Sequence, residues 1–157
     1  MNLIYNTPTT MFSESLEKGK QIEKEFVIRM IRKQLDILKI EFAPDGVFKD
    51  RDIRMLYNKN WEQKESTFEI KSDDKSLETW NICFEYMCNW QPSWIYASKA
   101  DVIVYHIWWE FYRKSRARLL LDLDKMNDKK SVIGWDGNRA EMFLIDRNKF
   151  IDLFTKI

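Results

Sequence analysis

A chain of 157 residues with 45% hydrophobic and 15% aromatic residues is long enough for one core and too apolar to be disordered. Its formal net charge of +1 argues against a broad basic coat for non-specific nucleic-acid binding. Two cysteines and one histidine are too few for a zinc cluster or for histidine-based catalysis. The chain has no apolar run that could span a bilayer and no secretory signal layout. We therefore expect a single cytoplasmic domain over residues 1–157, with no membrane partner.

The first predicted element is a long amphipathic helix. Apolar residues recur at three- and four-residue spacing over residues 13–39, and no proline interrupts them. Gly19 and Glu23 lie one turn apart on a face beside the apolar stripe. A glycine at this place would let a strand or a DNA backbone approach the helix. Glu25 is a competing acid, but it lies on a different face from Gly19.

A meander of strands is predicted next. Turn signals at residues 44–46 and 57–60 separate short extended runs at residues 47–48, 53–56 and 67–71. Because side chains alternate along a strand, the last run presents a carboxylate and an ammonium on one face and two apolar side chains on the other.

The chemistry of this region rests on three charged residues. Glu69 and Lys71 share one face of their strand, whereas Phe68 and Ile70 supply the buried face. Asp52 heads the preceding run, and pairing of the two runs would bring its carboxylate beside Glu69. Two carboxylates and a lysine at one place fit metal-dependent phosphodiester hydrolysis.

Other interpretations of these charges stay open. Asp45 and Asp50 are rival first acids, and Asp52 is preferred because the residues after it alternate as a strand should. A solvated surface strand that carries an ion pair is the structural alternative for any single Glu-x-Lys match.

A further strand is predicted at residues 81–86, where apolar and polar positions alternate and Glu85 lies near the end. The passage Ser93-Trp94-Ile95-Tyr96-Ala97-Ser98-Lys99-Ala100-Asp101 follows and leads into an apolar strand at residues 102–105. These two segments and the passage between them form a second recognisable block after the Glu-x-Lys strand.

Together these segments resemble the PD-(D/E)xK nuclease superfamily, with Asp52 as its first acid and Glu69-Ile70-Lys71 as its E-x-K. The run Gly19-Lys20-Gln21-Ile22-Glu23 looks like the G-x-x-x-E of Holliday-junction resolvases and related phage nucleases. The second block is similar to small phage and prokaryotic members, in which glycine is common where Trp94 stands. Arg51 replaces a proline that often precedes the first acid. The resemblance covers about residues 15–107.

This resemblance implies an α/β, restriction-endonuclease-like fold with a mixed central β-sheet flanked by helices. It implies a Mg²⁺-dependent DNA endonuclease, with Mn²⁺ as a substitute metal, in the host-cell cytoplasm if the source is a phage or virus. Branched DNA such as a Holliday junction is the first expected substrate, and a specific sequence recognised by a phage or mobile-element nuclease is the second. A homodimer would supply two active sites for symmetric cuts. The alternative is a catalytically silent nucleic-acid- or protein-binding module that kept the fold.

The resemblance also implies a role for each site residue. Metal ligands would be the carboxylates of Glu23, Asp52 and Glu69 with the carbonyl of Ile70, and Lys71 would position the attacking water. Glu85 and Lys99 are secondary candidates, for water or lysine positioning and for phosphate contact.

Basic residues gather in the first helix and after the aromatic run at residues 108–112. Basic side chains interleaved with aromatic ones suit backbone contact with DNA and stacking on exposed bases. The expected DNA contacts are Lys20, Arg113, Lys114 and Arg116.

In the last third of the chain, residues 119–127 are expected to form a short helix or a strand-to-helix segment, and residues 131–133 and 140–145 extended pieces. A last helix, capped by Asp146, is expected to run to Phe154. Five tryptophans fall between Trp80 and Trp109. A single domain has limited interior for such large side chains, so part of this region is expected to form a homodimer contact, or a surface that stacks on DNA bases.

Overall fold

The computed structural model describes residues 8–33, 36–44, 50–135 and 138–157. Helices and strands follow one another along the chain as α1 (Pro8–Arg32), β1 (Asp36–Phe42), β2 (Ile53–Lys59), β3 (Glu62–Ser72), α2 (Ser76–Thr79), β4 (Asn81–Cys88), β5 (Gln91–Pro92), α3 (Trp94–Ala97), β6 (Val102–Ile107), β7 (Glu110–Ser115), α4 (Arg116–Lys125), β8 (Lys130–Trp135), β9 (Arg139–Asp146), α5 (Arg147–Leu153) and β10 (Thr155–Lys156). Among the described residues no helix is long and apolar enough to cross a membrane.

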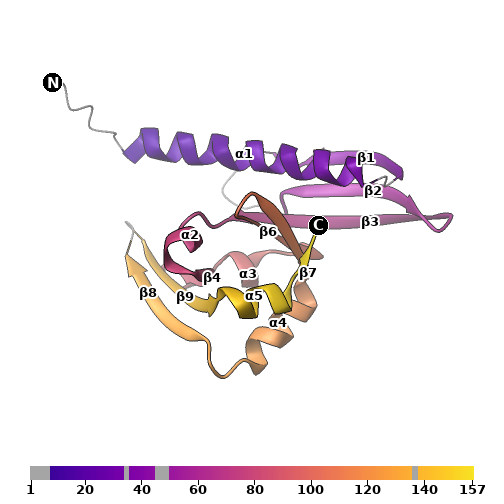
Figure 1. The fold of residues 1–157 in the computed structure, drawn as a ribbon. Helices are drawn as coiled ribbons and strands as arrows, with labels where there is room; N and C mark the ends of the chain where they lie inside the picture. Colours follow the sequence, from indigo (N-terminus) through magenta and orange to yellow (C-terminus); the bar gives the residue numbers. More distant parts are fainter. Residues whose placement is uncertain (1–7, 34–35, 45–49, 136–137) are drawn as a thin grey trace.

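Two sheets organise the molecule (Figure 1). The larger sheet has the strand order β1-β2-β3-β6-β7-β10, and it is mixed because β3 and β6 run parallel while its other neighbours are antiparallel. The smaller sheet has the order β5-β4-β9-β8 and is antiparallel throughout. The predicted α/β fold, a mixed central sheet flanked by helices, is confirmed at this level.

Helix α1 lies along one face of the larger sheet (Figure 1). Its buried side chains recur at helical spacing and pack against apolar side chains of β2, β3, β6 and β7. The helix-side contributors are Ile22, Phe26, Val27 and Met30, and they meet Ile53, Met55, Phe68, Val104 and Phe111.

The predicted helix over residues 13–39 is wrong at its C-terminal end, since residues 36–42 form strand β1. The register of β1 against β2 shifts between Ile37 and Lys39. This bulge lets Ile37 and Ile40, three residues apart, pack against the same core, while Leu38 is 50% exposed. The helix was predicted to continue because Leu35 and Leu38 extend the apolar spacing of Val27 and Ile31, yet Leu38 lies on a strand and is exposed.

The other face of the larger sheet packs against the smaller sheet and helices α3, α4 and α5. Tyr105 on β6 lies at the centre of this second core and is 1% exposed. Its hydroxyl donates to the carbonyl of Cys83 at 2.8 Å, which ties the two sheets together. Phe150 of α5 contacts the Tyr105 ring edge-on and stacks on Phe154.

Many of the remaining elements match predicted segments, whereas β5, β7, β10, α2 and α3 were not predicted. Strands β3, β4, β6, β8 and β9 and helices α4 and α5 all overlap the predicted segments. The expected turn at residues 57–60 lies two residues later, because β2 continues to Lys59. The expected turn at 44–46 and the run at 47–48 fall, except for Pro44, outside the described residues.

Three two-residue hairpin loops have an unusual backbone. Asn60-Trp61 joins β2 to β3, Asn89-Trp90 joins β4 to β5, and Trp108-Trp109 joins β6 to β7. All six of these residues have φ between 47° and 67°. Trp80, which ends α2, has a φ of 59°, and Trp94, which begins α3, has a φ of 25°.

These tryptophans store considerable strain. Within the described ranges, the non-glycine residues with positive φ are six tryptophans and two asparagines. Asparagine tolerates this region, whereas a bulky residue in it costs about 1–2 kcal/mol. Six such residues would cost on the order of 10 kcal/mol, which is comparable with the whole stability of an ordinary domain, about 5–15 kcal/mol.

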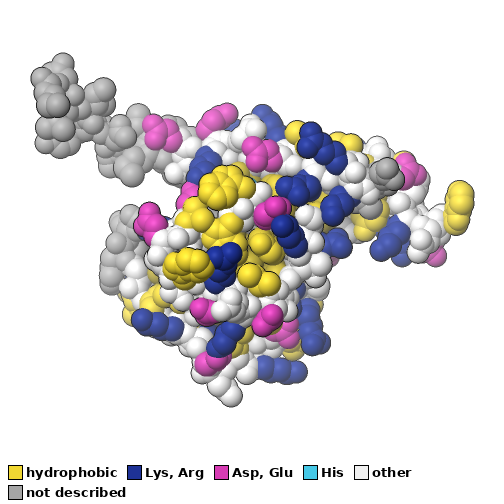
Figure 2. Space-filling view, in the orientation of Figure 1, with side chains coloured by type: hydrophobic (Ala, Val, Ile, Leu, Met, Phe, Trp, Pro, Cys, Tyr) yellow, Lys and Arg dark blue, Asp and Glu magenta, His cyan; other side chains and the backbone are white. Residues whose placement is uncertain are grey.

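Most of these indoles also lie on the surface. Trp61, Trp109, Trp90 and Trp80 are 104%, 77%, 66% and 59% exposed. On the face shown in Figure 2, apolar side chains are interspersed with both basic and acidic side chains, so this face does not carry charge of a single sign.

Candidate metal-binding and catalytic site

Asp52 lies where β2 begins to pair with β3. Its main-chain N–H donates to the carbonyl of Phe68 at 2.8 Å. Its Oδ2 accepts a hydrogen bond from the N–H of Ile70 at 2.7 Å, so the carboxylate takes a place that a main-chain carbonyl would occupy in a continuing ladder. Because Ile53 is paired with Phe68, Asp52 lies beside Glu69. Asp52 and Glu69 are only 8% and 9% exposed.

Strand β3 presents its residues alternately to the two cores. Phe68 and Ile70 pack on the side of α1. Glu69 pairs with Ile103 of β6, which belongs to the other core, and therefore projects to the opposite side. The Oε2 atom of Glu69 accepts from the hydroxyl of Ser98 at 3.4 Å.

Lys71 follows on the same side as Glu69 and is exposed. Its Nζ lies 5.5 Å from the ring centroid of Trp94, close enough for a cation–π contact. The indole Nε1 of Trp94 is buried and has no hydrogen-bond partner in the described part of the chain. The indole thus lies against the amine that would take part in catalysis.

The turn between α3 and β6 carries Ser98, which is hydrogen-bonded to Glu69. The Ser98 hydroxyl donates to the carbonyl of Asp50 at 3.3 Å and accepts from the N–H of Ala100 at 3.1 Å. The Asp101 carboxylate accepts from the N–H and hydroxyl of Thr67 at 2.9 and 2.8 Å. Ser98 and Asp101 belong to the passage that resembles the nuclease superfamily, but sequence reasoning assigned them no role. In the structure their hydrogen bonds attach this turn to β3 and to residue 50.

The rival first acids have other positions. Asp50 is exposed, and its carboxylate pairs with Nζ of Lys99 at 3.1 Å. Lys99, a secondary candidate for phosphate contact, is therefore part of a surface ion pair. Asp45 lies outside the described residues. Of the two described candidates for the first acid, Asp50 and Asp52, it is Asp52 that lies beside Glu69.

Glu23 lies on α1, which packs on the side of the larger sheet opposite to the Glu69 side chain. It is half-buried. Across the described ranges, no group of three or more His, Cys, Asp or Glu side chains is arranged to hold a metal, so the expected trio with Asp52 and Glu69 is not assembled as such. A Cβ at Gly19 would meet no atom within 4 Å, and hence no described strand uses this glycine for close approach.

Glu85, the other secondary candidate, lies on β4 of the smaller sheet. It accepts a hydrogen bond from the Ser93 hydroxyl, at the start of α3. Asp73 accepts from the N–H groups of Cys83 and Ser76 at 2.9 and 3.1 Å, and burial raises its pKa. Burial also raises the pKa of the Cys83 thiol to about 12, so this cysteine is a poor nucleophile. Asp73 belongs to no motif in the sequence, so sequence reasoning missed it.

Two of the four residues expected to contact DNA also make contacts within the protein. Lys114 pairs with Asp122 at 2.7 Å and its side chain is 12% exposed, and its hydrogen bond lowers the pKa of Asp122. Arg116 donates to two main-chain carbonyls of α3, at 3.1 and 3.2 Å. Arg113 is exposed and Lys20 is half-buried. Contact of these four residues with DNA stays a prediction.

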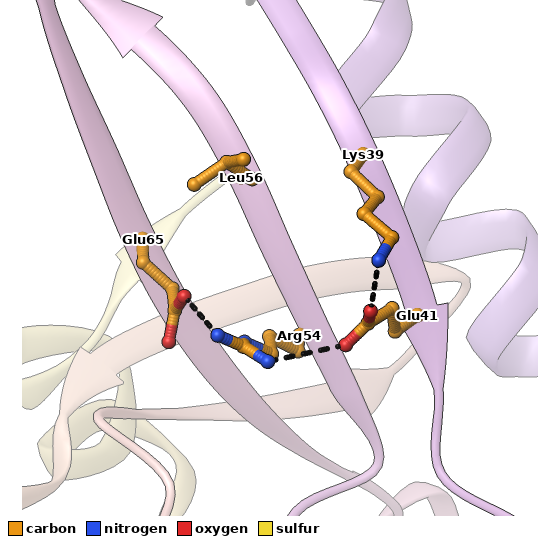
Figure 3. Close-up of a pocket in the computed structure, with 5 residues that line it drawn as sticks. All are labelled: Lys39, Glu41, Arg54, Leu56 and Glu65. Atoms are coloured by element: carbon orange, nitrogen blue, oxygen red, sulfur yellow. Dashed lines mark hydrogen bonds and ion pairs between the residues drawn. The ribbon is translucent and has the colours of Figure 1, made fainter.

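A shallow pocket lies on the outer part of β1, β2 and β3 (Figure 3). Arg54 reaches Glu65 at 2.5 Å and Glu41 at 3.4 Å, and Glu41 also pairs with Lys39 at 2.5 Å. The hydrogen bond and charge of Lys39 lower the pKa of Glu41. Because these charges neutralise one another, the pocket offers no evident site for an ion.

Comparison of the chain with protein-family models, with curated proteins and with solved structures finds no match in any of the three. The function must therefore be inferred from the geometry around Asp52, Glu69 and Lys71 and from the resemblance of their spacing to a nuclease motif.

Proposed function

We propose that this protein is a metal-dependent DNA endonuclease with a restriction-endonuclease-like core made of α1, β1, β2, β3 and β6. The observation that carries the proposal is the 2.7 Å hydrogen bond from the Ile70 N–H to Asp52, which holds that carboxylate beside Glu69. Both acids are nearly buried, and Lys71 follows on the same side of β3. This arrangement of two carboxylates and a lysine is what supports the proposal.

The donor chemistry fits a hard cation. Carboxylate and carbonyl oxygens are the ligands that Mg²⁺ prefers, and Asp52, Glu69 and the carbonyl of Ile70 supply them. Glu23 is proposed as a further carboxylate, although α1 lies on the side of the sheet opposite to the Glu69 side chain, and the variant Glu23→Gln tests its part in the site. When bound, Mg²⁺, or Mn²⁺ in its place, would polarise a phosphate and acidify a water. Ser98 would keep Glu69 oriented through its hydrogen bond.

Lys71 would act on the attacking water or on the charge that develops at the phosphate. Its ammonium carries three donors and is exposed, so a DNA strand can reach it. Branched DNA such as a Holliday junction is the first proposed substrate, and a specific duplex sequence is the second.

A cleavage assay tests this function. Supercoiled plasmid and a four-way junction are incubated with the protein in Mg²⁺, Mn²⁺ or EDTA, and nicking is expected with either metal and not with EDTA. Glu69→Gln and Lys71→Ala are expected to lower the rate by about 100-fold or more, and Glu23→Gln is tested beside them. Glu65→Gln and Lys64→Ala, exposed positions on the same strand, are matched controls with unchanged cleavage.

Retained cleavage by Lys71→Ala would show that the Glu-x-Lys match is a coincidence. Cleavage that persists in EDTA would contradict the metal-dependent mechanism.

A second candidate is a binding module without catalysis. The observation in its favour is that the described residues contain no group of three metal-ligating side chains. Metal-replete protein that binds junction DNA but cuts no form of DNA would establish this alternative.

A further inference from the structure

Three hairpin loops of this protein have positive φ angles, which are typical of glycine, at positions that include tryptophan. A two-residue hairpin loop with positive φ at both positions strongly favours Asn-Gly or Gly-Gly. The three such loops here are Asn60-Trp61, Asn89-Trp90 and Trp108-Trp109, each with both φ values positive. Asparagine stands in the first position of two loops, where the favoured pair also has asparagine.

Helix ends show the same pattern. Trp80 terminates α2 in the left-handed conformation, and its N–H donates to the carbonyl of Ser76 at 3.1 Å. Glycine is the usual residue at such a helix end because it has no Cβ. Trp94 has a φ of 25°, and its buried indole Nε1 has no partner among the described residues.

Composition gives independent support. Glycine supplies 4 residues of 157 and tryptophan 7. Together they make up about 7% of the chain, which is the usual share of glycine alone. Neither of the two described glycines, Gly19 and Gly134, has a φ in the left-handed region. Positions with a positive φ, which favours glycine, thus hold tryptophan, whereas the two described glycines occupy positions without a positive φ.

We propose that glycine is the residue inserted at Trp61, Trp80, Trp90, Trp94, Trp108 and Trp109 in the cell that makes this protein. One cause accounts for all six positions. The codon UGA is translated as tryptophan in some genetic codes and as glycine in others. If a gene from a cell that inserts glycine at UGA is translated with a code that inserts tryptophan, tryptophan replaces glycine at every UGA codon.

The consequence for the site rests on the proposed function. The Trp94 indole lies 5.5 Å from the ammonium of Lys71, and glycine at position 94 would remove this cation–π contact. In the glycine form the exposed ammonium of Lys71 would therefore be held only by its other surroundings.

Two matched proteins test the proposal. One carries glycine at all six positions and the other carries alanine at the same six. Both lose the indoles, but alanine keeps the Cβ that opposes positive φ. The midpoint of thermal unfolding is expected to be higher in the glycine protein than in the alanine protein by on the order of 10 °C. A glycine protein that folds where the alanine protein does not gives the same support.

An alanine protein as stable as the glycine protein, or a glycine protein that fails to fold, would overturn the proposal. Peptide masses of the protein purified from its own source provide a direct second readout. Glycine at positions 90 and 94 supports the proposal, and tryptophan there overturns it. Neither readout uses DNA cleavage, so each stands apart from the success or failure of the nuclease assignment.

Discussion

The Asp52 carboxylate has a structural role as well as its proposed chemical one. It accepts the N–H of Ile70, and a buried N–H without an acceptor costs about 1–3 kcal/mol. Sequence reasoning alone predicts that Asp52→Ala keeps or raises stability, because it removes a negative charge beside Glu69. The hydrogen bond changes that expectation, since alanine leaves Ile70 without this acceptor.

We therefore predict that Asp52→Ala lowers the free energy of unfolding by about 1–3 kcal/mol, and that Asp52→Asn, which keeps an oxygen acceptor, lowers it less. Both variants are expected to lose cleavage. Urea unfolding of the two variants and the parent measures the difference. Parent-like stability of Asp52→Ala would show that the bond to Ile70 contributes nothing.

The single histidine provides a prediction for pH. Burial is the main cause that lowers the pKa of His106 below its ordinary value of 6.5, and Lys18 and Arg29 lower it further while Glu25 and Asp74 act against them. As pH falls through about 6.5, the unfolded chain takes up a proton before the folded one. This contribution to stability is thus present at neutral pH and is lost as pH falls through the folded pKa.

His106→Gln has no group that titrates in this range. We predict that the midpoint of thermal unfolding falls further in the parent than in His106→Gln when the pH is lowered from about 7.5 to about 5.5. Carboxylates titrate in both proteins, so the difference between them isolates the histidine. Identical pH profiles would contradict a lowered pKa at this residue.

At the scale of elements, α5 shows a local signal that the sequence carried in full. Asp146 accepts the N–H of Asn148 at 2.9 Å and caps the helix, as its position before the apolar residues predicts. The helix then places Phe150 against Tyr105 in the core between the sheets.

We predict that Asp146→Ala lowers the free energy of unfolding by about 1 kcal/mol. Asn148→Ala is the matched control, because it keeps the N–H that the cap satisfies. Thermal or urea unfolding of both variants gives the comparison, and equal losses in the two would show that the side chain of Asp146 does not act as a cap.

Strand β1 shows where element-scale prediction failed. The helix was predicted to continue because Leu35 and Leu38 extend the apolar spacing of α1, whereas residues 36–42 form a strand whose register against β2 shifts between Ile37 and Lys39. Lys114 on β7 and Arg116 on α4 belong to one basic run, and they bind Asp122 and the carbonyls of α3. The pairing of β1 with β2 and the position of α3 depend on residues outside the local pattern, so that pattern could not reveal them.

At the scale of the whole molecule, the proposed homodimer depends on exposed aromatic surface. Trp80, Trp90 and Trp109 are well exposed, although Arg147 lies over the ring of Trp80 at 4.8 Å and Arg139 over that of Trp90 at 5.3 Å. We predict that the chain with tryptophan at these positions forms a homodimer at micromolar concentration. Light scattering of DNA-free protein measures this, and a strict monomer would favour stacking on DNA bases as the use of this surface.

The sequence by itself determined the local elements and the spacing of the proposed site. Alternating side chains place Glu69 and Lys71 on one face of β3, and Asp52 heads the strand that pairs with it, because these relations depend only on neighbours along the chain. Tertiary structure alone decided what surrounds them. The Ser98 hydroxyl, in the turn that precedes β6, donates a hydrogen bond to Glu69. Helix α1 covers the opposite side of the sheet, and Glu23 belongs to no three-acid group among the described residues. Such contacts join residues far apart in sequence, and only the packing of the two sheets and α1 brings them together.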